Sequence, residues 1–256
     1  MNTPRNLKWQ LGLACVLALA GVILMSAQIT RAAGPWYVDP AGNDGNDCLS
    51  IGSACQTIAV AIGKASAGDT INLAAGTYTE NVTVTKALTF VGADAATTIV
   101  DGGGTGRIFN ITSGAVTLQG LTLRNGSAGS GYGGAIQTYS PLTLNAVTVY
   151  TNTAYYGGGV YAVANVTLSN SRFEDNTATG PNINNDVRRG GGGLYVTGNL
   201  TVTQTDFVFN HTAGTGGGVS IRGNAVVNGG SFLRNATTYE PAGSGAAIGI
   251  TGTLYM

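Results

Sequence analysis

Charge is scarce in this sequence. Only 9% of its 256 residues are charged, and 12 Lys and Arg residues balance 12 Asp and Glu residues. A protein that binds nucleic acid needs a basic patch to neutralise the phosphates. The low and balanced charge therefore argues against a nucleic-acid partner, and it predicts a neutral surface rich in hydroxyl groups.

Histidine and cysteine are also scarce. The chain has one histidine, His211, and three cysteines. Metal sites made of clustered Cys and His ligands are therefore not expected, nor is a cysteine nucleophile paired with a histidine. The acidic run at residues 43–47 offers oxygen ligands for Ca²⁺, but Asp and Asn also form turns without a metal. We predict no cofactor and no metal site, with Ca²⁺ at this run as the alternative.

Residues 1–33 have the pattern of a secretory signal peptide. Arg5 and Lys8 precede an apolar run from Leu11 to Met25, and small residues near Ala33 offer a cleavage site. The run is short for a membrane span, and a single anchoring helix is the alternative. We predict a cleaved leader, secretion or display at the cell surface, and no membrane span in the mature chain.

Removal of this leader leaves Cys48 and Cys55 as the two cysteines of the mature chain. Exported proteins use such pairs as structural disulfides, and no further Cys or His lies nearby to complete a metal site. We therefore predict a disulfide between Cys48 and Cys55.

A repeated pattern fills the second half of the chain. The run Gly133-Gly134-Ala135-Ile136 is followed by a short alternating stretch and then by Asn152, and the same order returns from Gly157, Gly191 and Gly216. Short alternating stretches bounded by Gly, Asn, Asp and Ser indicate strands and turns, with no room for a helix. A unit repeated at this period is typical of a solenoid. We predict an all-β fold, a single-stranded right-handed parallel β-helix.

Two residue types recur at fixed places in this repeat. Phenylalanines lie three residues before successive asparagines, and the two sets are Phe173, Phe207 and Phe232, and Asn152, Asn176, Asn210 and Asn235. Residues at the same place in successive coils stack on one another. We therefore expect the rings to pack inside the solenoid and the asparagines to form a hydrogen-bonded ladder in one turn, as structural features and not as a ligand site.

Residues 34–70 are predicted to cap the first coil. Ile58, Ala61, Ile62 and Ala65 recur at helical spacing, and Gly68 follows the run. Such an amphipathic helix covers the unpaired strand edge and the apolar cross-section of a solenoid. The coils then occupy residues 71–256, and no comparable cap follows them. We therefore expect further coils, a partner or a second copy of the chain to cover that end.

The cap and the repeats resemble two known groups of proteins. The stretches Tyr37-Val38-Asp39, Gly42-Asn43-Asp44, Thr57-Ile58, Gly68-Asp69-Thr70-Ile71 and Gly76-Thr77-Tyr78 resemble the N-terminal cap and first coil of bacterial secreted pectate-lyase-like β-helix proteins. The GGAI run at Gly133 and the FxxN runs at Phe173, Phe207 and Phe232 resemble the repeats of the polymorphic outer-membrane protein family. The first resemblance implies the fold, and the second implies a β-helical adhesin.

Two insertions interrupt the repeat at the same turn. About ten extra residues lie between Asn176 and Asn210, and a shorter insertion follows Asn235. Together with neighbouring coils they gather aromatic and charged residues at one edge: Tyr155, Tyr156, Asp186, Arg188, Arg189, His211, Tyr239 and Glu240. Aromatic faces with a few polar groups are typical of carbohydrate sites. We predict a ligand-binding edge, the alternative being irregular solvated loops.

No catalytic residue is assigned from the sequence. Glu174 and Asp175 alternate along one strand end and point apart, so they do not form a facing carboxylate pair. A single Asp186 beside Arg188 or Arg189 makes a poor calcium site for a lyase. We therefore expect a non-catalytic protein that binds or adheres to polysaccharide or cell-surface glycans. The alternative is a polysaccharide lyase or a glycosidase.

Overall fold

The computed structural model describes residues 35–181, 190–238 and 247–256. The predicted leader lies outside the described residues. Within them the chain forms short strands, a 3-10 helix η1 (Ile51–Ser53) and an α-helix α2 (Ile58–Lys64). No helix in these three ranges has the length and hydropathy required to cross a membrane.

The described strands pair in parallel into three sheets, which we name A, B and C. Sheet A has two strips that share the long strands β8 (Val116–Arg124) and β10 (Leu142–Tyr150). Besides these, strip A1 contains β1 (Trp36–Val38), β2 (Thr70–Leu73), β5 (Leu88–Gly92), β13 (Val166–Ser169), β17 (Leu200–Thr203), β21 (Ala225–Asn228) and β25 (Leu254–Tyr255). Strip A2 contains β3 (Gly76–Thr79), β6 (Thr98–Asp101), β14 (Arg172–Glu174), β18 (Asp206–Val208) and β22 (Phe232–Leu233).

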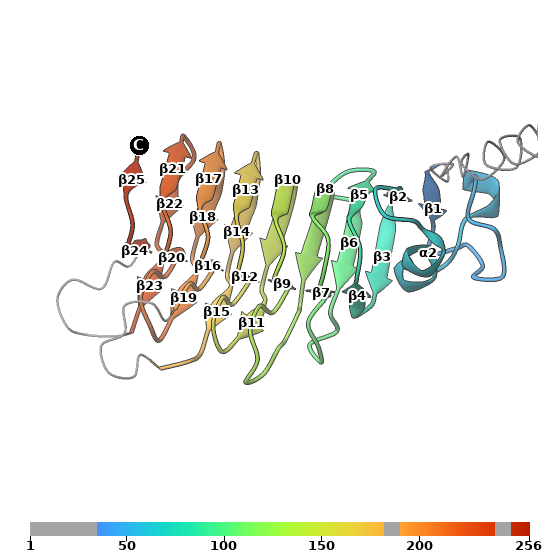
Figure 1. Cartoon of the computed structure of the whole chain (residues 1–256). Helices are drawn as coiled ribbons and strands as arrows, with labels where there is room; N and C mark the ends of the chain where they lie inside the picture. The colour runs from blue at the N-terminus through green and yellow to red at the C-terminus, as the bar shows by residue number, and fades with distance from the viewer. Residues whose placement is uncertain (1–34, 182–189, 239–246) are drawn as a thin grey trace, which may run out of the picture. The chain divides into compact units, whose positions relative to one another are not determined.

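The other two sheets have shorter strands. Sheet B contains β4 (Val82–Val84), β7 (Phe109–Ile111), β9 (Ile136–Thr138), β12 (Val160–Ala162), β16 (Leu194–Val196), β20 (Val219–Ile221) and β24 (Ile248–Ile250). Sheet C contains β11 (Thr153–Ala154), β15 (Thr177–Ala178), β19 (His211–Thr212) and β23 (Ala236–Thr237). One coil runs through strips A1 and A2, sheet C and sheet B before it returns to strip A1. Figure 1 shows successive coils side by side in chain order. The predicted parallel β-helix is therefore confirmed.

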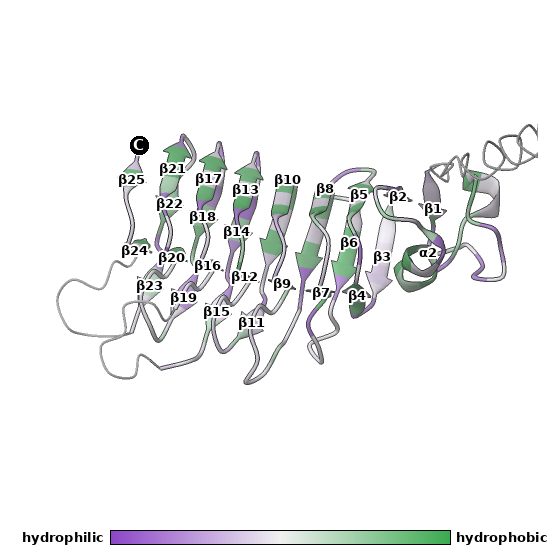
Figure 2. Ribbon diagram, in the orientation of Figure 1, coloured by the Kyte–Doolittle hydropathy of each residue, from purple (hydrophilic) through white to green (hydrophobic). Residues whose placement is uncertain are grey.

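The corner between strips A1 and A2 is made by a left-handed residue. Ala146, Asn170 and Gln204 have φ angles of 52°, 49° and 46° at this place in three successive coils. Residues other than glycine adopt this left-handed backbone conformation at some cost in energy. The conformation is therefore found where the chain must turn sharply. The bend directs alternate side chains of both strips inward. Figure 2 shows the hydrophobic residues concentrated in the strands and in α2.

The inward positions of successive coils form columns of like side chains. Phe173 and Phe207 are fully buried and stack with their ring centroids 4.7 Å apart, and Phe207 stacks on Phe232 at 4.9 Å. The asparagine column lies at the corner between strip A2 and sheet C. In this column the side-chain amide of each of Asn152, Asn176 and Asn210 donates to the Oδ1 atom of the next asparagine at 2.9 Å, and the last acceptor is Asn235.

The capping helix α2 lies against the first coil (Figure 1). Ile58, Ala61 and Ile62 are its buried residues. Its N-terminal amides are bound by a carboxylate from the coil, because Glu80 accepts hydrogen bonds from the N–H groups of Ile58 at 2.8 Å and Ala59 at 3.1 Å. Burial raises the pKa of Glu80, although these two hydrogen bonds oppose the shift. A carboxylate at a helix N-terminus also interacts favourably with the helix dipole.

The cap also covers the free edge of β1. Tyr37 donates its N–H to the carbonyl of Cys48 at 2.8 Å and accepts from the N–H of Cys55 at 2.9 Å. A disulfide joins Cys48 and Cys55, and both residues are fully buried. An exposed edge strand invites pairing with other chains. The disulfide loop therefore closes the first coil at its edge, while α2 covers its cross-section.

Removal of this disulfide is expected to loosen the cap. On the loop-entropy relation, a bridge across a sequence separation of 7 contributes about 2.5 kcal/mol. Reduction, or the double change Cys48→Ser and Cys55→Ser, should lower the free energy of unfolding by this amount in urea titrations. A midpoint that reduction leaves unchanged would contradict a stabilising role for the bridge.

Candidate functional site

The predicted ligand-binding edge is described only in part. Asp186, Arg188, Arg189, Tyr239 and Glu240 lie outside the described residues. The segments that hold them follow β15 and β23 and precede β16 and β24, so both insertions connect sheet C to sheet B.

The remaining three residues of the predicted edge are placed in two columns. Tyr155 and Tyr156 follow β11, and their rings meet edge to face with centroids 4.6 Å apart. His211 is exposed on β19, in register with Thr177 and Ala236. The structure thus brings the two tyrosines together and leaves His211 in another column of sheet C.

Tyr156 leads into a row of stacked tyrosines that the sequence reasoning missed. Its ring stacks on Tyr132 at 5.9 Å, Tyr132 stacks on Tyr161 at 4.7 Å, and Tyr161 stacks on Tyr195 at 4.9 Å. We call Tyr132, Tyr156, Tyr161 and Tyr195 the tyrosine row. A signal for part of it was present in the sequence, because Tyr161 and Tyr195 occupy the same place in successive repeats.

The strand alternation explains why this row faces outward. In β12 the side chains of Val160 and Ala162 are buried inside the solenoid, so Tyr161 points to the other side of sheet B. Tyr161 is in register with Gln137 and Tyr195, and Tyr195 is in register with Ser220. The outward column of sheet B therefore contains Tyr161 and Tyr195 in its middle, with the polar side chains of Gln137 and Ser220 on either side of them.

One polar atom of this column lacks a partner. Ser220 is only 1% exposed although it is at an outward position, and its Oγ atom is the one buried side-chain N or O atom of the described residues without a hydrogen bond. An unpaired buried hydroxyl is costly, so such groups are rare away from functional sites.

The hydroxyl of Tyr161 stays protonated at physiological pH. Burial, with contributions from the neighbouring Tyr195, Tyr132 and Tyr139, raises the pKa of Tyr161 to about 12, and Arg222 opposes the shift. A protonated phenol both donates and accepts hydrogen bonds. Tyr132 is 38% exposed and Tyr161 is half-buried, whereas Tyr156 and Tyr195 are buried at 8% and 5%. The row therefore reaches the surface at Tyr132 and, in part, at Tyr161.

Arginines lie at the two ends of this surface. Arg107 donates from Nε to the carbonyls of Tyr132 at 2.8 Å and Gly133 at 3.0 Å, and from Nη1 to Asn110 at 3.4 Å. Burial lowers the pKa of Arg107, but a guanidinium remains charged in proteins. Arg222, one residue past β20, is exposed at the other end.

Carboxylates are missing from the same surface. Among the described residues, the outward positions of the sheet B strands are uncharged: Thr83, Asn110, Gln137, Tyr161, Tyr195, Ser220 and Gly249. The partly exposed side chains here include Tyr132, at 38%, and Tyr139, at 55%, whose hydroxyl accepts from Gln137 at 2.6 Å. The surface therefore has a positive charge at each end and an aromatic, hydrogen-bonding middle.

The described residues contain no group of three or more His, Cys, Asp or Glu that would suit a metal ion. The carboxylates of the acidic run take part in local hydrogen bonds. Asp44 accepts from the N–H groups of Gln56 and Thr57, each at 2.9 Å, and Asp47 accepts from the Ser53 hydroxyl at 2.6 Å. That the protein holds no metal, with Ca²⁺ at this run as the alternative, stays a prediction.

The sequence matches no protein-family profile and no curated protein. Among solved structures, a rhamnogalacturonan lyase is similar at 16% identity, with a TM-score of 0.45 over 87% of this chain and 62% of that one. The pectate lyase Pel9A is similar at 15% identity, with a TM-score of 0.41 over 86% of this chain and 75% of that one. This chain thus spans 62% of the length of the rhamnogalacturonan lyase.

The protein is a parallel β-helix, as its own strand pairing establishes. The fold that the resemblance to pectate-lyase-like proteins implied is the one that this strand pairing shows. The resemblance of its repeats to polymorphic outer-membrane proteins stays a prediction. At these identities the structural neighbours carry no residue roles over to this chain.

Proposed function

We propose that this protein binds an extended acidic polysaccharide on the outer face of sheet B and does not cleave it. The observation that carries the proposal is the tyrosine row with an arginine at each end and, among the described residues, no carboxylate between them. Guanidinium groups pair with carboxylates in a bidentate way, and aromatic groups with polar tips suit sugar rings. The positive ends favour a polymer that carries uronate groups.

The surface is long enough for several sugar units of a polysaccharide and not only for a single sugar. Its outward column crosses from β7 to β20, which is four strand spacings or about 19 Å. A ligand of this kind would run parallel to the solenoid axis across the coils.

The absence of outward carboxylates favours binding over cleavage. Glycosidases act through a pair of carboxyl groups, and a lyase of this fold uses acidic calcium ligands with a basic proton acceptor. The described outer face of sheet B has arginines but no acidic partner for them. A polysaccharide lyase remains the alternative, and an assay for unsaturated products distinguishes it from a binding protein.

Binding outside the cytoplasm accords with the predicted leader, and we propose that the protein is exported or displayed at the cell surface. The N-terminus of protein collected outside the cell tests this. A start near Gly34 supports export with cleavage, whereas an intact Met1 contradicts it.

Substitutions in the tyrosine row are expected to weaken this binding. Tyr132→Ala and Tyr161→Ala should each raise the Kd for an oligogalacturonate about tenfold, or ~1.4 kcal/mol, because each removes a ring that contacts two neighbours. Arg222→Ala should have a similar effect and should reduce the salt dependence of binding. Isothermal titration calorimetry measures both.

Tyr150 provides a matched control, because it is equally exposed, at 38%, but lies on strip A2. Tyr150→Ala should leave the Kd unchanged. If acidic, neutral and cationic polysaccharides all fail to bind the wild-type protein, or if Tyr161→Ala binds as tightly as the wild type, the proposal is wrong. An increase in absorbance from unsaturated products would show that the protein is a polysaccharide lyase.

A further inference from the structure

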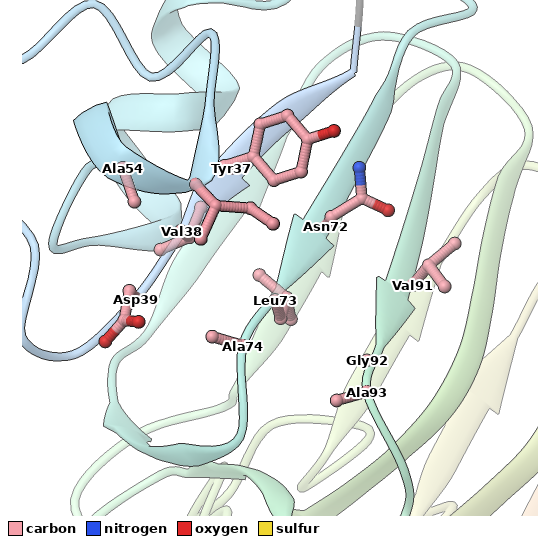
Figure 3. Close-up of a pocket in the computed structure, with 11 residues that line it drawn as sticks. Tyr37, Val38, Asp39, Ala54, Asn72, Leu73, Ala74, Val91, Gly92 and Ala93 are labelled. Carbon is pink, nitrogen blue, oxygen red and sulfur yellow. The ribbon is translucent and has the colours of Figure 1, made fainter.

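A second concave site lies at the other side of the solenoid, where the cap meets strip A1. It is a pocket of about 340 Å³, within the size range of ligand sites. Its base is made by outward side chains of three neighbouring strands, since Tyr37 on β1 is in register with Asn72 on β2, and Asn72 with Val91 on β5. Figure 3 shows these three side chains on the same side of the sheet.

The cap provides one wall of this pocket. Ile51 of η1, which is 76% exposed, and Ala54 line it from the disulfide loop. The loop is held to β1 by the backbone hydrogen bonds of Tyr37 with Cys48 and Cys55. Below the pocket, the Tyr78 hydroxyl donates to the carbonyls of Val38 at 3.0 Å and Ala74 at 2.9 Å. The pocket is therefore preformed, and the cap loop bounds it on one side.

The lining has the chemistry of a sugar site. Tyr37 supplies an aromatic ring, Asn72 supplies a carboxamide that both donates and accepts, and Val91 supplies an apolar surface. Asp39 is the one charged residue of the lining, and its Oδ1 atom accepts from the N–H of Ala41 at 2.8 Å. A carboxylate accepts hydrogen bonds from sugar hydroxyl groups but repels a uronate.

The column that contains Tyr37 continues beyond the pocket along strip A1. After Val91 it passes through Gln119, Asn145, Ser169 and Thr203, as the strand register shows. A parallel column holds Thr89, Thr117, Thr143, Thr167 and Thr201. None of these outward residues is charged, and they repeat at the strand spacing of about 4.8 Å. A neutral surface with an amide or hydroxyl group on most coils leads away from the pocket.

We propose that the pocket binds the terminal unit of a neutral glycan chain, whose following units run over Gln119 and Asn145. The cap loop bounds the pocket on one side at Ile51 and Ala54, and the uncharged surface leads away on the side of β5. The sheet B surface differs in charge, because its described residues include two arginines and no outward carboxylate. The protein thus has two glycan sites with different charge preferences, and this site does not depend on the function proposed above.

The experiment titrates the mature protein with neutral hexasaccharides of glucan, mannan and galactan, and separately with hexagalacturonate. At least one neutral hexasaccharide should bind with a Kd that salt leaves unchanged, and the amide NMR signals of Tyr37, Asn72 and Val91 should shift. Tyr37→Ala and Asn72→Ala should each raise this Kd about tenfold. Ala93→Trp, which changes an exposed residue of the lining, should block the pocket without altering the core.

Chain length tests the direction of the ligand. Gln119→Ala and Asn145→Ala should weaken the hexasaccharide a few-fold and leave the disaccharide of the same sugar unaffected, because only the longer ligand reaches them. Tyr150→Ala on strip A2 should bind like the wild type. The proposal is overturned if no neutral oligosaccharide binds, or if Tyr37→Ala and Ala93→Trp both bind normally while still folded by circular dichroism. Binding of hexagalacturonate is measured separately, so the result can contradict one proposed site and leave the other in place.

Discussion

Phe207→Ala is expected to lower the free energy of unfolding by about 4 kcal/mol. The Phe207 ring is fully buried and stacks on Phe173 at 4.7 Å and on Phe232 at 4.9 Å. Its removal leaves a cavity between two coils and takes a stacking partner from both neighbours. A solenoid depends on contacts between adjacent coils, so one cavity weakens two of these interfaces. Urea denaturation followed by circular dichroism measures the change.

Leu233 provides the control for this prediction. It follows Phe232 in β22 but points outward and is 55% exposed. Leu233→Ala should change the free energy of unfolding by less than about 0.5 kcal/mol. Phe207→Leu, which keeps most of the buried volume, should fall between the two alanine variants. Equal midpoints for Phe207→Ala and Leu233→Ala would show that the ring column does not stabilise the fold.

Asn210→Ala is expected to lower the free energy of unfolding by about 3 kcal/mol. Asn210 is fully buried, and its Oδ1 atom accepts from the backbone N–H of Asn176 at 3.1 Å and from its side-chain amide at 2.9 Å. Its own amide donates to the carbonyl of Phe173 and to Oδ1 of Asn235, each at 2.9 Å. Alanine leaves these donors and acceptors buried without partners.

Asn210→Asp separates hydrogen bonding from volume in the same position. The carboxylate keeps the size of the side chain and can accept from Asn176, but it has no N–H to donate to Phe173 and Asn235. The variant should therefore be destabilised at neutral pH and should recover in part at a pH where the carboxyl group is protonated. Thr203→Ala, an exposed change on strip A1, is the control. If Asn210→Asp is as stable as the wild type at pH 7, the hydrogen bonds that the Asn210 amide donates do not stabilise the fold.

The fold was predictable because a solenoid is a local pattern repeated. Phe207 and Asn210 each recur at a fixed place in the repeat. Residues at the same place in successive coils share a column, so their stacking could be predicted. The capping helix was predictable for a similar reason, since Ile58, Ala61 and Ile62 form an apolar stripe within a few residues. In both cases the interactions that matter are set by spacing along the chain.

The candidate sites were less predictable. The sequence indicated Tyr155 and Tyr156 as part of an edge. Tyr132 and Tyr156 precede equivalent glycines and pair as a parallel bridge, so their stacking could have been predicted from the period. The stacking of Tyr132 on Tyr161 could not, because these two residues occupy different places in the repeat. It placed His211 with them because all three residues follow the asparagine column. His211 lies on β19 in the column of Thr177 and Ala236, however, whereas the two tyrosines lie beyond the end of β11. The insertions that carry Asp186 and Glu240 have no repeat partner, so periodicity says nothing about where they lie.

The sequence by itself thus determined the period, the strands, the inward columns and the presence of a cap, because each depends on residues at a fixed spacing. Only the tertiary structure decided which outward side chains meet. Tyr132 joins Tyr161, and Tyr37 meets Asn72 beside Ile51, through the register between coils and the fold of the cap loop. Inward positions are constrained by packing on every coil, whereas outward positions are free to vary. Contacts between residues at different places in the repeat, such as Tyr132 with Tyr161, therefore leave no periodic signal.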